Sequence, residues 1–117
     1  MENGPAMVLS MEAGKPIEVE EEESLADSLG GGIGLDNRYT LALVQELVDE
    51  TLLVSEDEIG QAIRYVFERQ RMELEGGAAV GTAALLAKKL EAHGLNVALI
   101  YSGNNIADKT LRKVLDS

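Results

Sequence analysis

The chain has 117 residues, of which 45% are hydrophobic, and contains three Tyr, one Phe, no Trp and no Cys. This length fits one small domain with an aliphatic core. The net charge of −11 argues against nucleic-acid and membrane-surface partners, because both carry negative charge. The absence of cysteine excludes disulfides and thiolate zinc sites. Since the first residues show no basic segment followed by an apolar run, we expect a cytoplasmic protein.

The first 24 residues predict an acidic lead-in segment with little regular structure. Pro5, Gly14 and Pro16 interrupt any helix here, and five of the six residues from 18 to 23 are glutamates. Like charges at this density repel one another and favour a solvated, extended chain. We expect no metal site in this run, which supplies neither His nor Asp. The main domain is expected to span residues 25–117.

A glycine-rich loop follows at residues 25–35, where Gly30 and Gly31 allow a close backbone approach or a positive φ. Taken alone, the loop is as consistent with a tight connection as with a phosphate cradle. Its likeness to a dinucleotide-binding fingerprint is rejected, because no strand precedes it. Asp36 or Asn37 can cap a helix over residues 38–48, and the apolar run 51–54 predicts a short buried strand.

The clearest helix is predicted over residues 55–72, which begin with the capping box Ser-Glu-Asp-Glu. Its apolar stripe faces a core, and Arg64 belongs to its solvent face. A second helix, rich in small residues, is expected from about 78 to 90. The apolar run 96–101 has the pattern of a central parallel strand. A last short helix is expected from about 107 to 115.

The alternation of helices and strands predicts an α/β fold with a parallel sheet. Ligands in such sheets bind outside the carboxyl ends of the strands. Ser102 directly follows the expected strand 96–101 and is therefore the best-placed polar side chain for ligand contact. Read singly, Ser102-Gly103 is an ordinary turn and Glu75 an ordinary surface carboxylate. His93 is expected at a helix end, where a cation suits the helix dipole.

Five segments taken together resemble one family. They are residues 25–34 (LADSLGGGIG), 47–49 (LVD), 54–59 (VSEDEI), 74–81 (LEGGAAVG) and 102–105 (SGNN). Their order and spacing are similar to those of the serine/threonine dehydratases, pyridoxal-phosphate-dependent enzymes of fold type II, the tryptophan-synthase-β-like group. The Asp-Ser-Leu-Gly-Gly-Gly form of the first segment is most similar to the dehydratases of hydroxyectoine utilisation. The resemblance covers residues 4 to 105.

This resemblance implies a fold, a cofactor and a reaction. The chain would be the carboxy-terminal part of a cofactor domain, a partial three-layer sandwich with a parallel sheet. The cofactor of the complete enzyme would be pyridoxal 5′-phosphate, and its substrate an amino acid. The reaction would eliminate water from a β-hydroxy amino acid and then release ammonia to give a 2-oxo acid.

The resemblance also implies roles for individual residues. Ser102 would hydrogen-bond the pyridine nitrogen of the cofactor, and Glu75 would lie near the ring. A neutral hydroxyl leaves that nitrogen largely unprotonated, which suits elimination. The cofactor-binding residues implied in this way are Ser28, Gly30, Gly31, Glu75, Ser102 and Gly103.

The chain departs from the family pattern in several places. Asn104 replaces the second glycine of the family's Ser-Gly-Gly-Asn motif, where a side chain would strain the turn or crowd the ring. Gly4 and Ala6 stand where a metal-binding carboxylate would be wanted, so no metal site is carried over. No segment matches the Schiff-base lysine motif or the phosphate-binding loop, so no catalytic residue is assigned.

We therefore expect an incomplete dehydratase that is inactive alone, and that pairs with a separate amino-terminal half or forms a homo-oligomer. The alternative is a small acidic α/β protein-interaction module in which the active-site residues are relics.

Overall fold

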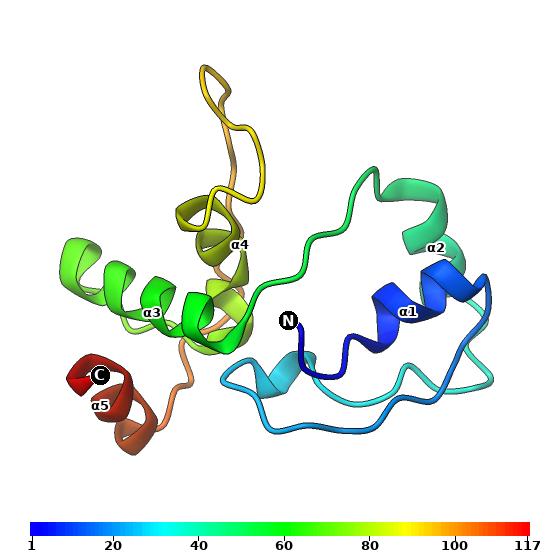
Figure 1. Cartoon of the computed structure of the whole chain (residues 1–117), viewed down its shortest axis with the longest axis horizontal. Helices are drawn as coiled ribbons and strands as arrows, with labels where there is room; N and C mark the ends of the chain where they lie inside the picture. The colour runs from blue at the N-terminus through cyan, green and yellow to red at the C-terminus, as the bar shows by residue number, and fades with distance from the viewer.

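The computed structural model describes all 117 residues, as helices joined by turns and extended segments (Figure 1). The elements are α1 (Ala6–Ala13), the 3-10 turn η1 (Asp27–Leu29), α2 (Thr40–Leu47), α3 (Glu56–Gln70), α4 (Gly76–Leu86) and α5 (Asp108–Asp116). Helix α3 packs against α4 and α5, η1 packs against α4, and α1 packs against α2. Figure 1 shows the resulting division into a group around α3 and a separate α1–α2 pair.

Helix α3 has the strongest local signals and forms where the sequence predicts it. Ser55 Oγ accepts a hydrogen bond from the Glu58 amide at 3.3 Å, and Glu58 Oε2 accepts one from the Ser55 amide at 2.8 Å. This reciprocal pair is the expected capping box. The stripe of Ile59, Ile63 and Val66 is fully buried, which confirms the predicted core face.

The hydrophobic core lies where α3 meets α4 and α5. Helix α4 contributes four small buried residues, Ala78, Ala79, Ala83 and Ala84, which allow its backbone to approach α3 closely. Leu111 and Val114 cover the core from α5. The small-residue helix therefore packs against α3, whereas its apolar residues on nearly every side favour packing against a sheet.

The sequence predicts Arg64 on the solvent face of α3. In the structure, Arg64 instead ties α3 to α5. Its Nη2 atom donates hydrogen bonds to the Val114 carbonyl and, at 2.9 Å, to Ser117 Oγ. The prediction for Arg64 is wrong because α5 packs over this side of α3, a contact that the periodicity of α3 alone does not reveal.

The two predicted strands are not paired, and the structure contains no sheet. Residues 51–54 and 96–101 are outside any helix and make no ladder of backbone hydrogen bonds. Leu95, Val97, Leu99 and Ile100 remain 37–86% exposed. A central parallel strand needs a neighbour to satisfy its backbone groups, and these 117 residues supply none.

Helix α1 occupies part of the lead-in segment, where little regular structure was expected. Pro5 precedes its first residue, and Gly14 closes it with a left-handed φ of 69°. Proline near a helix start and glycine just after its end delimit a helix rather than interrupt it, which is why the expectation was wrong. The buried Ser10 fixes the chain that follows α1, because its Oγ accepts a hydrogen bond from the Ile17 amide at 3.2 Å.

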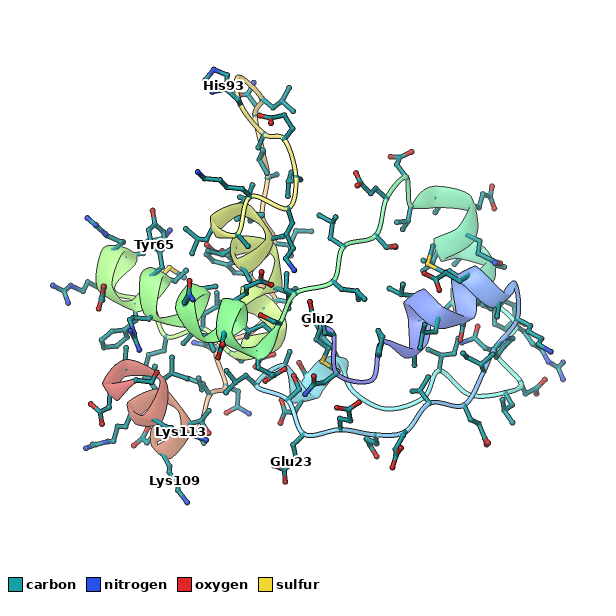
Figure 2. The ribbon with its side chains drawn as sticks, in the orientation of Figure 1. Glu2, Glu23, Tyr65, His93, Lys109 and Lys113 are labelled. Atoms are coloured by element: carbon teal, nitrogen blue, oxygen red, sulfur yellow. The ribbon has the colours of Figure 1, made fainter.

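The segment after α4 differs from the sequence prediction as well. Helix α4 ends at Leu86, four residues earlier than expected, and Lys88 takes a left-handed φ of 54°. His93 therefore lies at the tip of an exposed loop and not at a helix end (Figure 2). No helix is both long enough and apolar enough to cross a bilayer.

Candidate functional site

The segment from Ser24 to Leu29 lies across the start of α4. Helix α4 opens with two glycines, and both lie against this segment. A Cβ atom on Gly76 would overlap the Leu25 carbonyl, and one on Gly77 would overlap Ser28 Oγ. The Ser28 side chain thereby packs against the first turn of α4.

Glu56 holds the same segment from the α3 side. Its two carboxylate oxygens accept hydrogen bonds from Ser24 Oγ at 2.6 Å and from the Leu25 amide at 2.7 Å. Hydrogen bonds to a carboxylate are stronger than those between neutral groups. The first turn of α3 therefore fixes the start of the loop that carries Ser28.

The turn after Tyr101 returns to the same place. The Glu75 amide donates to the Gly103 carbonyl at 3.4 Å, and Glu75 Oε2 accepts from the Asn105 amide at 3.2 Å. A Cβ atom on Gly103 would lie 2.6 Å from the Glu75 carboxyl carbon. Residues far apart in the sequence thus converge at the amino end of α4.

Ser102 is exposed at the beginning of this turn. Tyr101 before it is anchored on α4, because its hydroxyl lies 2.9 Å from Thr82 Oγ1. Ser102, Gly103 and Asn104 line a shallow hollow of about 590 Å³ together with residues 71–74. Asn104 is exposed and its φ is not positive, so the strain expected from a side chain at this position is absent.

Four of the six cofactor-binding residues predicted from the sequence lie around the start of α4, and two do not. Ser28, Glu75, Ser102 and Gly103 lie around the start of α4. Gly30 is turned toward its own loop, with its amide bonded to the Asp27 carbonyl at 2.9 Å, whereas Gly31 has a φ of 84° and the Glu21 side chain as its near neighbour.

Glu75 and Ser102 face different sides of the turn. Glu75 lines a groove of about 830 Å³ between α3 and α5, whereas Ser102 lines the separate hollow next to residues 71–74. The groove has carboxylates along much of its wall, with Arg64 and Lys113 as its cations. Figure 2 shows Lys113 on α5 on the side that faces the lead-in segment, where Glu23 lies.

Three residues at this convergence carry no site prediction from the sequence. Gly76 and Gly77 were noted only as part of a motif, although two glycines at a helix start signal a close backbone approach. Glu56 was read only as part of the capping box, and its binding of Ser24 and Leu25 depends on tertiary structure.

An ion pair joins the first turn of α3 to Lys89, three residues beyond the end of α4. Lys89 Nζ lies 2.9 Å from Glu58 Oε2 and donates to the Leu53 carbonyl at 2.8 Å. The Ser55 amide and then Lys89 hold the pKa of Glu58 below its usual range. Hydrogen bonding to Glu58 raises the pKa of Lys89. The Lys89 side chain is therefore only partly exposed and is held by these two contacts.

Residues 1–103 match the family described as "Pyridoxal-phosphate dependent enzyme". The chain therefore belongs to the pyridoxal-phosphate-dependent enzymes, and the cofactor of this family is pyridoxal phosphate.

Individual relatives show which members of this family the chain is similar to. The chain is 47% identical over 116 residues to a Sinorhizobium fredii protein named "Putative threonine dehydratase", covering 99% of this chain and 35% of that protein. It is 36% identical over 115 residues to the L-threonine ammonia-lyase of Thermotoga maritima, covering 98% of this chain and 28% of that protein. The chain thus spans about a third of the length of these relatives.

Solved structures agree with these relatives. The serine racemase of Dictyostelium discoideum superimposes with a TM-score of 0.71 at 29% identity, over 87% of this chain and 32% of that one. A threonine deaminase from T.th. superimposes with a TM-score of 0.70 at 28% identity, over 91% of this chain and 38% of that one. These likenesses support the predicted fold class, although the sheet itself is not formed within these residues.

Proposed function

We propose that the chain forms the carboxy-terminal part of the cofactor domain of a serine/threonine dehydratase that acts in the cytoplasm. The reaction is elimination of water from a β-hydroxy amino acid, followed by release of ammonia to give a 2-oxo acid. The observation that carries the proposal is the family match over residues 1–103, which ends at the Ser102-Gly103 turn where the site residues converge.

The residues of the turn fit one part of the cofactor. The exposed hydroxyl of Ser102 can donate a hydrogen bond to a pyridine nitrogen, and Ser102 and Gly103 both line the hollow beside it. When bound, pyridoxal phosphate supplies an electron sink for the amino acid. Ser102 would orient the ring and, being neutral, would leave its nitrogen without a formal charge.

The remaining cofactor contacts must come from residues that this chain does not supply. None of its five lysines lies in a Schiff-base motif, and Lys89 is held by Glu58 and the Leu53 carbonyl. We propose that the chain functions together with a region matching the other two thirds of its relatives, as a separate partner or within one assembly. The segment with Val97, Leu99 and Ile100, which are exposed here, would pair in its sheet.

The loop that carries Ser28 suggests the substrate. The Asp-Ser-Leu-Gly-Gly-Gly form of residues 27–32 supports a hydroxy amino acid of hydroxyectoine breakdown as the physiological substrate, in addition to L-threonine or L-serine. Ser28 is exposed beside the start of α4, where it could contact the substrate.

The test is a hybrid enzyme in which residues 1–117 replace the matching region of the Sinorhizobium fredii relative. We expect it to bind pyridoxal phosphate and to convert a β-hydroxy amino acid to a 2-oxo acid, measured by the absorbance of the product hydrazone. Comparing L-threonine, L-serine and hydroxyectoine-derived amino acids would rank the substrates. A folded hybrid that binds no cofactor would contradict the proposal and favour the interaction module with relic residues.

A further inference from the structure

We propose that Glu75 is a positioning residue, which acts by holding the Gly103–Asn105 backbone and thereby sets the direction of Ser102. The inference rests on the proposed function for its consequence, because the role of Ser102 belongs to that proposal. The contact between Glu75 and the Gly103–Asn105 backbone does not depend on the proposed function.

The geometry assigns the Glu75 carboxylate to the turn. Its Oε2 atom accepts the Asn105 amide hydrogen at 3.2 Å, and its own amide donates to the Gly103 carbonyl at 3.4 Å. Glu75 therefore binds the turn from both its main chain and its side chain. Such a two-point contact restrains the backbone on both sides of residue 104.

Gly103 is the structural counterpart of this contact. A Cβ atom there would lie 2.6 Å from the Glu75 carboxyl carbon and 2.6 Å from Oε1. The carboxylate thus occupies the space above the glycine, and the glycine is required for it to reach the Asn105 amide. Glu75 and Gly103 form one unit, which explains why a turn residue without a side chain faces a charged group.

The location of Glu75 separates it from the ligand side of the turn. It lines the groove between α3 and α5, whereas Ser102 lines the hollow on the other side. From this position the carboxylate influences Ser102 through the backbone rather than by reaching the same ligand. What matters is then the hydrogen-bond acceptor at Oε2, and not the negative charge.

A pair of substitutions distinguishes these roles. Glu75→Gln keeps an acceptor for the Asn105 amide and removes the charge, whereas Glu75→Ala removes both. In the hybrid enzyme, we expect Glu75→Ala to raise the dissociation constant for pyridoxal phosphate about tenfold, and Glu75→Gln to change it less than about twofold. Glu68→Ala, on the exposed face of α3, is the matched control. Equal losses for Gln and Ala would overturn the proposal, because the charge would then be essential.

Hydrogen exchange of the Asn105 amide, measured in the cofactor-free hybrid, gives a readout that needs no activity. Glu75→Ala should speed this exchange about tenfold, while Glu75→Gln and Glu68→Ala leave it close to the parent value. Unchanged exchange in Glu75→Ala would overturn the inference. If the hybrid binds no pyridoxal phosphate but Asn105 exchange responds as expected, the proposed function fails while the contact stands.

Discussion

Ser28 Oγ fills the space that a Cβ atom on residue 77 would occupy, so the serine hydroxyl packs against helix α4 where the helix carries no side chain. The adjacent Gly76 is even more constrained, since its would-be neighbours are backbone atoms of Leu25 and Ala26. A serine hydroxyl can rotate away from an added methyl group, whereas a backbone carbonyl cannot. The two glycines therefore differ in how much change they tolerate.

The first prediction compares glycines in two helices. Gly76→Ala should destabilise the hybrid enzyme by about 1–3 kcal/mol or more, because the loop backbone must move. Gly60→Ala in α3 is the matched control: its Cβ atom would lie 3.7 Å from Leu25 Cδ1, an ordinary contact, so helix propensity should stabilise by about 0.5–1 kcal/mol. Urea unfolding measures both. A neutral Gly76→Ala would contradict the described packing.

The second prediction concerns Ser102. Ser102→Ala should weaken cofactor retention in the hybrid by about 0.5–1.5 kcal/mol, the net value of one hydrogen bond. Ser102→Asp should do greater harm to elimination, because a carboxylate favours a protonated ring nitrogen. Cofactor dissociation and the elimination rate on L-serine are the measurements. If Ser102→Asp equals the parent in both, Ser102 is not the partner of the ring nitrogen.

The third prediction is a pH dependence of stability from Glu58. Its pKa is lowered in the folded chain, chiefly by the Ser55 amide, so its ionised form contributes stability above its unfolded pKa. This contribution is lost as the pH falls from the unfolded pKa through the lowered folded pKa. In the hybrid enzyme, the melting temperatures of the parent and of Glu58→Gln between pH 3 and 7 should therefore converge at the acid end, with the parent more stable at neutral pH. Glu68→Gln is the exposed control. If the melting temperatures of the parent and of Glu58→Gln change in parallel with pH, the prediction is wrong.

The fourth prediction concerns the isolated 117-residue chain in solution. Only 19 residues are buried, while Val97, Leu99 and Ile100 are exposed in an unpaired extended segment. We expect the chain to self-associate or to unfold in part. Ile100→Lys should reduce association in sedimentation velocity runs, and Leu35→Lys, in an exposed loop, should not. A monodisperse monomer with a sharp two-state melt would count against the expectation.

The fifth prediction is that this isolated chain has no Schiff-base lysine. With pyridoxal phosphate and borohydride, mass spectrometry should find no single lysine labelled specifically, and L-threonine and L-serine should not be turned over. The candidate positions are Lys15, Lys88, Lys89, Lys109 and Lys113. Specific labelling of one of them, accompanied by turnover, would show that the chain carries its own catalytic lysine.

The features that could be predicted from the sequence are those encoded by near neighbours. The capping box at Ser55 involves residues three positions apart, and both its hydrogen bonds form. The run 96–101 has the composition of a strand, but pairing needs another segment, so no local pattern could show that it stays unpaired here. Residues 6–13 form α1 between Pro5 and Gly14, and sequence alone does not tell whether such residues interrupt a helix or mark its two ends.

The candidate site was predictable to a similar extent. The resemblance implies that Glu75, Ser102 and Gly103 bind one cofactor. In the structure Glu75 contacts Gly103 while Ser102 lines a separate hollow, so the shared role stays a prediction. The binding of Ser24 and Leu25 by Glu56 depends on contacts across 31 or 32 residues. Periodicity and spacing carry no information about such contacts, so the support of the site had to come from the structure.

The link from Arg64 to the end of α5 has a consequence for how the molecule opens. With nine residues, α5 is too short to persist as an isolated helix in water. It owes its order to Leu111, Val114 and the Arg64 hydrogen bonds, all of which face α3. Helix α5 can therefore detach as a unit while the capped α3 stays formed. Native-state hydrogen exchange should show this order. The amides of α5 should exchange faster than those of Ile59 to Val66.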